Sequence, residues 1–344
     1  MTVVRAAHEA HGATFREVAG RAVPVEYGRP DRTHRAVRNA AGVTEHAFDV
    51  VVATGEDAHE VVAAGVSGGV PTEDGRGAYV VVCDDGRVRA DGYVFATDDR
   101  LLGLVPAGEG DRVASRWRER AGSRDAAVTL STGEFGTFGV HGPQATEKVA
   151  SVLHRASPPE ERLRFVRGEM EGGVTVVRDD DLAGEEGYLV VCAAEDADDV
   201  FETLLVRGLN AVPFGRETWE TLTLEAGTPL FASELAGRTL ATLGLARLDG
   251  SDAAAAGEPH RRLVGLAPDA LPASEAAVYA DGSRVGEVTR AAESPMRGDP
   301  LAFAVVSEWH GELSVAADGD RVDAAVVEPP FVDTGERSRR RPEY

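Results

Sequence analysis

Three carboxylates stand in sequence surroundings that suit chemistry as well as solvation. Asp91 lies in the run GRVRADGYVF, residues 86–95, where small and apolar residues alternate with other types at period two and predict a β-strand, although strands usually avoid aspartate. Glu185 stands between Gly184 and a Glu-Gly pair at the start of another strand, and Glu225 lies in the apolar, strand-like run TLTLEAGTPLFASEL, residues 221–235. Carboxylates stabilise positive charge and accept paired N–H donors. A solvated strand or turn position is the alternative for each.

Other residue types predict no metal, phosphate or hydrolase site. His8 and His11 are three residues apart and have no third ligand at metal-binding spacing, so we expect solvent-facing histidines. The glycine-rich run 66–77 lacks the Lys-Ser/Thr pair of a phosphate-binding loop, and no Gly-x-Ser-x-Gly elbow occurs. Cys83 and Cys192 lie in apolar strand runs and are expected to be reduced core residues.

The composition predicts a salt-adapted protein with a substantial core. Of 344 residues 43% are hydrophobic, the formal net charge is −22, and Lys148 is the only lysine. Dense carboxylates hold water and ions in concentrated salt, where screening weakens their mutual repulsion. The same charge argues against nucleic-acid binding, and the basic run RSRRR (337–341) is expected to be a disordered, solvated terminus. No run reaches membrane-spanning length and the N-terminus has no apolar export segment, so we expect a cytoplasmic location.

Two passages of the chain repeat one order of helices and strands. Residues 5–20 and 31–41 are predicted to be helices. The first passage then has a helix (55–66), strands in AYVVVCDD, VRADGYVFA and LLGLVP, and the helix GDRVASRWRERAG. The second has a helix (142–155), the strands VTVVRD and GYLVVCA, and the helix DADDVFETLLVRGL. This order predicts two α+β modules, residues 1–135 and 136–247, each with an antiparallel sheet covered on one face by helices.

A linker and a small β-barrel are predicted to follow. Residues 248–258 are small and polar, contain glycine and show no apolar periodicity, which is typical of a linker. Residues 259–333 contain only short strands and turns, with a hairpin turn at Asp281-Gly282, and predict a barrel. Residues 334–344 are assigned to a tail.

Six segments, in order, resemble the glycine-cleavage T-protein (aminomethyltransferase) family and its folate-binding relatives. They span nearly the whole chain: HEAHGATFREVAGRAVPVEYG (8–28), GRVRADGYVF (86–95), FGVHGPQA (138–145), GEEGYLV (184–190), LEAGTPLFASEL (224–235), and RRLVGL with VGEVTRAAESP (261–295).

The resemblance implies a fold and a reaction. The fold is α+β, with two ferredoxin-like antiparallel modules forming the folate-binding region and a C-terminal β-barrel. Such enzymes transfer a one-carbon unit to tetrahydrofolate from an aminomethyl group on a lipoyl carrier protein, with release of ammonia; a methylated amine is the alternative donor. Asp91 matches the catalytic aspartate, which stabilises the cation developing beside folate N5, and Glu185 matches the pterin-binding glutamate. Glu225, Tyr93 and Tyr27 are assigned to the folate site by the same resemblance.

The chain also departs from the family pattern. Trp219 and Thr223 stand where the family's Arg-Asp-x-Leu-Arg segment has arginines, and Pro106 replaces an asparagine. Loss of arginines that meet the glutamate tail of folate removes charge-assisted bonds of roughly 1.5–3 kcal/mol each. Arg216 and Arg178 are the candidate substitutes.

Three hypotheses follow from this mixture of matches and departures. The chain is an aminomethyltransferase, a non-catalytic folate-binding protein that supports a process such as iron-sulfur maintenance, as in the YgfZ-type branch, or a structural paralogue that binds no folate. The Lys-Gly-Cys signature of the YgfZ-type branch is absent from the sequence. Asp91 and Glu185 favour the first two hypotheses, whereas Trp219, Thr223 and Pro106 favour the last two.

Overall fold

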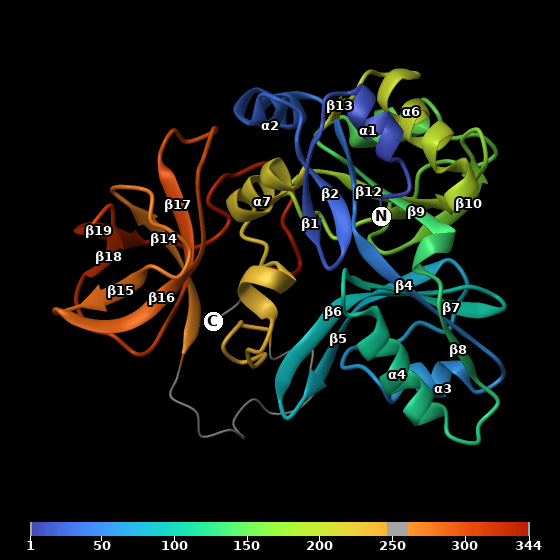
Figure 1. Ribbon diagram of the computed structural model, residues 1–344, viewed down its shortest axis with the longest axis horizontal. Helices are drawn as coiled ribbons and strands as arrows, with labels where there is room; N and C mark the ends of the chain where they lie inside the picture. Colours follow the sequence, from blue (N-terminus) through green and yellow to red (C-terminus); the bar gives the residue numbers. More distant parts are fainter. Residues whose placement is uncertain (1, 246–260, 343–344) are drawn as a thin grey trace. The chain divides into compact units, whose positions relative to one another are not determined.

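The computed structural model describes residues 2–245 and 261–342, which form two compact units (Figure 1). The N-terminal unit comprises Met1–Asp84, Arg89–Asp180 and Glu186–Thr218. The C-terminal unit comprises Asp85–Val88, Asp181–Glu185 and Trp219–Tyr344. The predicted linker, residues 248–258, lies outside the described residues.

A five-stranded sheet carries Asp91. Its strand order is β5-β6-β7-β4-β8, and one face packs against helices α3 and α4. The apolar residues Val113, Trp117 and Ala121 recur every four positions along α4, so that helix buries one stripe against the sheet. The elements are β4 (Phe48–Thr54), α3 (Ala58–Ala63), β5 (Arg76–Asp84), β6 (Arg87–Ala96), β7 (Arg100–Pro106), α4 (Gly110–Ala121) and β8 (Ala127–Leu130).

A six-stranded sheet forms the other half of the N-terminal unit. Its order is β10-β11-β12-β9-β3-β13, and β3 pairs with β9 across about ninety residues of chain. One face packs against α1, α5 and α6 around Phe138 and Phe201. The elements are β3 (Gly42–Glu45), η1 (Thr132–Glu134), β9 (Phe135–His141), α5 (Ala145–Ala150), β10 (Phe165–Glu169), β11 (Gly173–Arg178), β12 (Gly187–Ala193), η2 (Ala194–Asp196), α6 (Ala197–Val206) and β13 (Val212–Pro213).

The two remaining sheet faces pack against each other. Tyr93 and Phe95 of β6 share one apolar cluster with Phe165 of β10 and Leu189 of β12. The rings of Phe95 and Phe165 meet edge to face with centroids 6.0 Å apart. The N-terminal unit is therefore layered as helices, sheet, sheet and helices. This confirms the predicted fold class, an α+β arrangement in which each sheet is covered by helices on one face.

The prediction of one helix over residues 5–20 is wrong. Helix α1 (Arg5–Ala10) is short, and β1 (Thr14–Val18) and β2 (Arg21–Glu26) then form an antiparallel hairpin. Thr14, Phe15 and Val18 are β-branched or aromatic and favour this extended pairing. The second predicted helix is present as α2 (Pro30–Asn39), with proline in its first turn.

The C-terminal unit contains a closed antiparallel barrel, as predicted. Its strand order is β14-β17-β16-β15-β18-β19, and Leu266, Val278 and Val315 lie in its core. Asp281-Gly282 forms the turn between β15 and β16. The strands are β14 (Arg262–Pro268), β15 (Ala277–Ala280), β16 (Ser283–Glu293), β17 (Pro300–Val306), β18 (Leu313–Ala317) and β19 (Asp320–Val326).

Two expectations for segments outside the barrel strands are wrong. The run around Glu225 is not a strand, because helix α7 (Arg216–Glu225) ends at that residue and a π-helical turn, η3 (Phe231–Leu235), follows. Burial of Leu222 and Leu224 outweighs the strand preference of the neighbouring threonines. The RSRRR run is not a solvated terminus, because Ser338 and Arg340 are buried.

The single lysine is buried at the end of a helix. Lys148 lies on α5, and its ammonium group donates to the carbonyl oxygens of Thr203, at 3.4 Å, and Arg207 at the C-terminal end of α6. A cation is favourable there because the helix dipole is negative at that end. Burial lowers the pKa of Lys148 to about 8.

We predict that folding depends on salt, because the net charge of −22 leaves strong repulsion among surface carboxylates. Molar potassium chloride screens this repulsion and should raise Tm, by about 2–4 °C for each kcal/mol of repulsion removed. Thermal melts followed by circular dichroism in dilute buffer and in molar potassium chloride provide the measurement. Equal Tm values in the two buffers would rule out salt adaptation.

We also predict that Lys148 changes the pH dependence of stability. The folded protein releases the Lys148 proton near pH 8, whereas the unfolded chain keeps it to a pKa of 10.5. The unfolded state therefore holds more protons between these values, and this group makes stability rise with pH across that window. The free energy of unfolding of wild type minus that of Lys148→Met should grow between pH 8 and 10, with a slope of up to about 1.4 kcal/mol per pH unit. A flat or falling difference in denaturant titrations contradicts this.

Candidate active site

Strand β6 points Asp91 into the space between the two sheets. Tyr93 and Phe95 belong to the core between the sheets, whereas Ala90 and Val94 belong to the core under the helices. Because successive side chains of a strand point to opposite faces, Asp91 shares the face of Tyr93 and Phe95.

Gly92, the next residue, allows an unusually close approach of two strands. Its φ is 155°, and a Cβ at this position would lie 2.0 Å from the carbonyl oxygen of Leu104 on β7. Only glycine fits this geometry without moving the backbone. The pairing of Tyr93 with Leu104 follows directly and holds the backbone of β6 beside Asp91.

The Asp91 carboxylate is buried against aromatic side chains. Asp91 is 5% exposed, so its interpretation as a solvated strand residue is wrong. The Tyr79 hydroxyl donates to Asp91 Oδ2 at 3.0 Å. The ring of Tyr79 lies 5.8 Å from that of Tyr93, which stacks on Phe95 at 6.0 Å. A hydroxyl-held carboxylate beside an aromatic row has the chemistry to stabilise a cation and to contact a flat ligand.

Tyr27 belongs to a different buried group in the N-terminal unit. Its hydroxyl lies 2.7 Å from His8 Nδ1, and His8 Nε2 lies 2.9 Å from Glu45 Oε2. His8 is fully buried, so the prediction of a solvent-facing histidine is wrong. Burial, reinforced by Glu45, raises the pKa of Tyr27, so its hydroxyl stays protonated and can donate to the ring.

Glu185 ends a short loop of the C-terminal unit, and its neighbours are firmly held. Gly184 has a φ of 77° and its carbonyl oxygen accepts from Thr334 Oγ1 and from the backbone N–H of Glu336, the latter at 3.2 Å. A Cβ on Gly184 would meet Thr334 Oγ1 at 2.5 Å. Thr228 Oγ1 donates to the carbonyl oxygen of Leu182 at 2.7 Å. Glu185 itself is 8% exposed.

Glu225 is fully buried at the end of α7 in the same unit. Its Oε1 accepts from Ser294 Oγ at 2.6 Å, and its backbone oxygen accepts from the N–H groups of Phe331 and Val332. Helix α7, the end of the barrel strand β16 and the C-terminal segment therefore meet at this residue.

A buried histidine cluster in the six-stranded sheet was missed by the sequence analysis. His141 Nδ1 lies 3.4 Å from Asp179 Oδ2, and the rings of His141 and His46 are 5.7 Å apart. Arg178 Nη1 donates to the carbonyl oxygen of Gly187 at 3.1 Å. Burial, together with His46 and Arg178, holds the pKa of His141 well below its ordinary value, so the ring is neutral. The only sequence signal was a histidine in the FGVHGPQA segment, which is typical of a turn.

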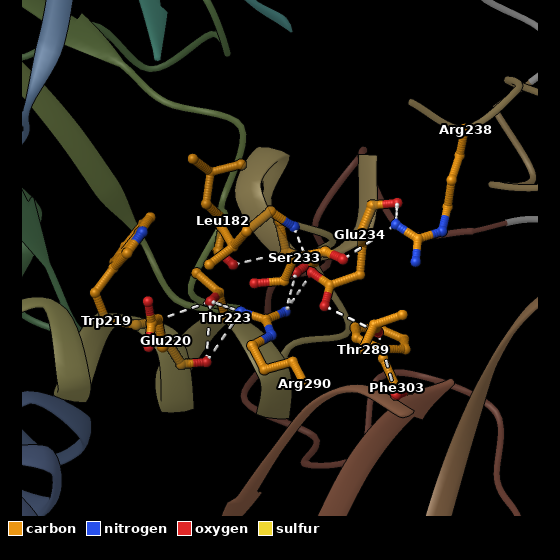
Figure 2. Close-up of polar contacts among 12 residues, drawn as sticks. Leu182, Trp219, Glu220, Thr223, Ser233, Glu234, Arg238, Thr289, Arg290 and Phe303 are labelled. Atoms are coloured by element: carbon orange, nitrogen blue, oxygen red, sulfur yellow. Dashed lines mark hydrogen bonds and ion pairs between the residues drawn. The ribbon is translucent and has the colours of Figure 1, made fainter. Parts of the chain in front are cut away.

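Thr223 stands at a position where the family motif has arginine. In this chain Thr223 is fully buried and contacts an arginine from a different element. Arg290 Nη1, from β16, donates to Thr223 Oγ1 at 2.9 Å (Figure 2). Sequence reasoning proposed Arg216 or Arg178 as substitutes and did not identify Arg290, because nothing in the motif VGEVTRAAESP reveals where its arginine points.

A cavity of about 520 Å³ lies in the N-terminal unit, and Phe95, Phe165, Arg167 and Cys192 are among its lining residues, whereas Asp91 is not. Among residues 2–245 and 261–342, no group of three or more His, Cys, Asp and Glu side chains has a geometry suited to a metal ion. In that same part of the chain, each helix is too short or too polar to cross a bilayer.

Comparison with known proteins gives consistent matches along the chain. The GCVT N-terminal domain matches residues 4–248, and the glycine cleavage T-protein C-terminal barrel domain matches residues 261–333. An aminomethyltransferase of Streptomyces coelicolor is 30% identical, with 96% of each chain covered. A relative from Haloarcula marismortui is 27% identical, with 95% of this chain and 97% of that one covered, which agrees with the expected salt adaptation.

A solved structure supports the same fold. The aminomethyltransferase T of the Bartonella henselae glycine cleavage system superposes with a TM-score of 0.86 over 98% of both chains, at 20% sequence identity. The likeness in fold, the two matched domains and the full-length relatives agree with one another, and the chain belongs to the glycine cleavage T-protein family.

Proposed function

We propose that this protein is a tetrahydrofolate-dependent aminomethyltransferase. It takes the one-carbon unit of an aminomethyl group carried on the sulfur of a lipoyl protein and joins that carbon to two nitrogens of tetrahydrofolate. The carbon–nitrogen bond that breaks releases ammonia, and the carbon–sulfur bond that breaks leaves the lipoyl arm as a free thiol. Family membership and aminomethyltransferase relatives of nearly equal length support this reaction class. The single observation that carries the proposal is Asp91, a buried carboxylate held by Tyr79 at the position that matches the family's catalytic aspartate.

The role proposed for Asp91 is electrostatic stabilisation of positive charge. Transfer of the aminomethyl carbon generates positive charge beside the reacting nitrogen, and a fixed anion in a site of low dielectric stabilises such charge without reorganising. The Tyr79 hydroxyl holds one carboxylate oxygen. The antiparallel pairing of β6 with β7 begins at Tyr93 and Leu104, directly after Gly92, and holds the backbone beside Asp91, so the charge is positioned before substrate arrives.

The role proposed for Glu185 is recognition. A carboxylate accepts two parallel hydrogen bonds, which matches the adjacent amino and ring N–H donors of a pterin. The loop that carries Glu185 is bonded at Leu182 and Gly184, so the glutamate needs little ordering when ligand binds. Tyr93 would offer an aromatic surface to the ligand, and Glu225 would support the glutamate loop from the end of α7.

The non-catalytic alternative remains an outcome of the same experiments. A folate-binding protein without transfer activity would bind tetrahydrofolate and fail to turn over with any donor. The named relatives do not favour it. An aminomethylated lipoyl carrier and a methylated amine such as dimethylglycine are therefore tested side by side.

We predict that Asp91→Asn separates binding from chemistry. The variant keeps the shape of the side chain and removes its charge, so tetrahydrofolate affinity should stay within a few fold. Turnover should fall by about 10² or more, the scale for loss of one electrostatic group. Calorimetric titration in molar potassium chloride measures affinity, and methylene-tetrahydrofolate formation measures turnover. Full turnover in Asp91→Asn would remove Asp91 from the catalytic role.

We predict the opposite pattern for Glu185→Gln. Loss of the anionic acceptor should weaken tetrahydrofolate binding by about tenfold or more, because a charged hydrogen bond contributes roughly 1.5–3 kcal/mol. Glu186→Gln, at the neighbouring position, is the matched control and should bind as wild type does. Equal affinities in the two variants would reject the recognition role. A wild-type protein that binds no tetrahydrofolate would reject the proposed function itself.

A further inference from the structure

Arg290 leaves the barrel wall at an irregularity of strand β16. The register of the β16–β17 pair shifts between Val288 and Arg290, which marks a bulge. Bulges redirect side chains that would otherwise follow the alternation of the strand. Arg290 is 6% exposed, and its side chain reaches α7 and the turn after it.

The Arg290 guanidinium joins three parts of the C-terminal unit (Figure 2). Nη1 donates to the carbonyl oxygen of Glu220 at 3.1 Å and to Thr223 Oγ1 at 2.9 Å, both on α7. Nη2 donates to the carbonyl oxygen of Thr228 at 2.8 Å and lies 3.3 Å from Glu234 Oε2. A planar fork of donors can satisfy this many acceptors at once, which an ammonium group cannot.

Glu234 is the anion that keeps this cation in place. It is fully buried, its Oε2 accepts from the N–H of Leu230 at 2.8 Å, and its Oε1 accepts from Thr289 Oγ1 at 3.2 Å. Burial raises the pKa of Glu234, and the Arg290 charge opposes that rise. Each member of the pair would be an uncompensated buried charge without the other.

The same network leads to the loop of Glu185. Thr228, whose carbonyl oxygen accepts from Arg290, donates through its own hydroxyl to the carbonyl oxygen of Leu182. Leu182 lies three residues before Glu185 in the short loop segment of this unit. Glu225 lies on the stretch of chain between Thr223 and Thr228, both of which Arg290 holds.

We infer that Arg290 is a positioning residue that sets folate affinity by holding α7 and, through Thr228 and Leu182, the loop that carries Glu185. Arg290 extends from the barrel and places a buried guanidinium beside Thr223. The family motif instead has an arginine at the position of Thr223 itself. This inference rests on the proposed function. Because Arg290 acts on the recognition glutamate and not on the transfer chemistry, its loss raises Kd and KM for tetrahydrofolate and leaves kcat nearly unchanged.

The matched control is Arg238, which also contacts the η3 turn. Arg238 Nη1 donates to the carbonyl oxygens of Ser233 and Glu234 (Figure 2), but its contacts in the described network do not include Thr223 or Thr228. Arg238→Met and Arg290→Met thus both remove a guanidinium from the turn. Only the second removes the hydrogen bond to the carbonyl oxygen of Thr228, the residue that bonds to Leu182.

The experiment measures tetrahydrofolate affinity by calorimetry and kcat at saturating folate, in molar potassium chloride and well below each variant's Tm. Arg290→Met should raise Kd by about tenfold or more, the lower end of the range seen when a residue that orients a ligating group is removed, with kcat within a few fold. Arg238→Met should bind within about threefold of wild type. Equal Kd values for the two variants, whatever their Tm, would make Arg290 a purely structural residue and overturn the inference.

Moving the charge from the barrel strand to the helix provides a second, independent test. It can be used even if Arg290→Met does not fold. The double variant Thr223→Arg with Arg290→Thr returns a guanidinium to the same pocket from helix α7. The double variant should bind tetrahydrofolate more tightly than Arg290→Met does, and that result supports the inference. Where Arg290→Met does not fold, Arg290→Lys takes its place in the comparison. A folded double variant that binds no better than these overturns it. Wild type that fails to bind tetrahydrofolate overturns the proposed function and this inference together, whereas wild-type binding with unaffected variants overturns this inference alone.

Discussion

The buried pair of Arg290 and Glu234 is the interaction on which the arrangement of the C-terminal unit depends. A carboxylate with no exposed surface is stable only when a cation and several hydrogen-bond donors replace the water it has lost. Here the replacement ties a barrel strand, the end of a helix and a π-helical turn to one guanidinium. Removing Arg290 would take from Glu234 its only ion pair within 4 Å among the described residues, so the three parts gain stability when they assemble together. The loop of Glu185 is joined to this assembly by the hydrogen bond from Thr228 to Leu182, and it is also held at Gly184 by Thr334 and Glu336.

Acidic groups on the surface and acidic groups in the interior respond differently to salt. The chain carries a net charge of −22, yet three acidic groups of the proposed site and of the network beside it are buried and individually partnered, Asp91 by Tyr79, Glu225 by Ser294 and Glu234 by Arg290. Surface repulsion is relieved by salt, whereas buried pairs are screened much less. Salt should therefore change overall stability far more than the internal geometry of these partners.

Sequence periodicity was enough to identify the strand of Asp91 but not the burial of its side chain. Alternation at period two placed a strand at residues 86–95, whereas burial arises because a second sheet, with strands some seventy residues further along the chain, covers that face. The helix ending at Glu225 was missed because its threonines favour strands and its apolar residues gain burial from long-range packing. The direction of Arg290 depends on a bulge, which is a property of strand pairing and leaves no local pattern. The short strands and turns of residues 259–333 were enough to predict the barrel. The family resemblance supplied the order of motifs, and it could not show which arginine would stand beside Thr223.

An isotope label on the transferred carbon shows directly whether this chain carries out one-carbon transfer to tetrahydrofolate. A lipoyl carrier protein bearing a ¹³C-labelled aminomethyl group would be mixed with the protein and tetrahydrofolate in molar potassium chloride, and the label followed by NMR together with free ammonia. If the protein catalyses this transfer, the label leaves the carrier and appears as the methylene carbon between N5 and N10 of the folate, with one ammonia released for each carbon moved. Label that stays on the carrier while tetrahydrofolate is bound would contradict the proposed transfer.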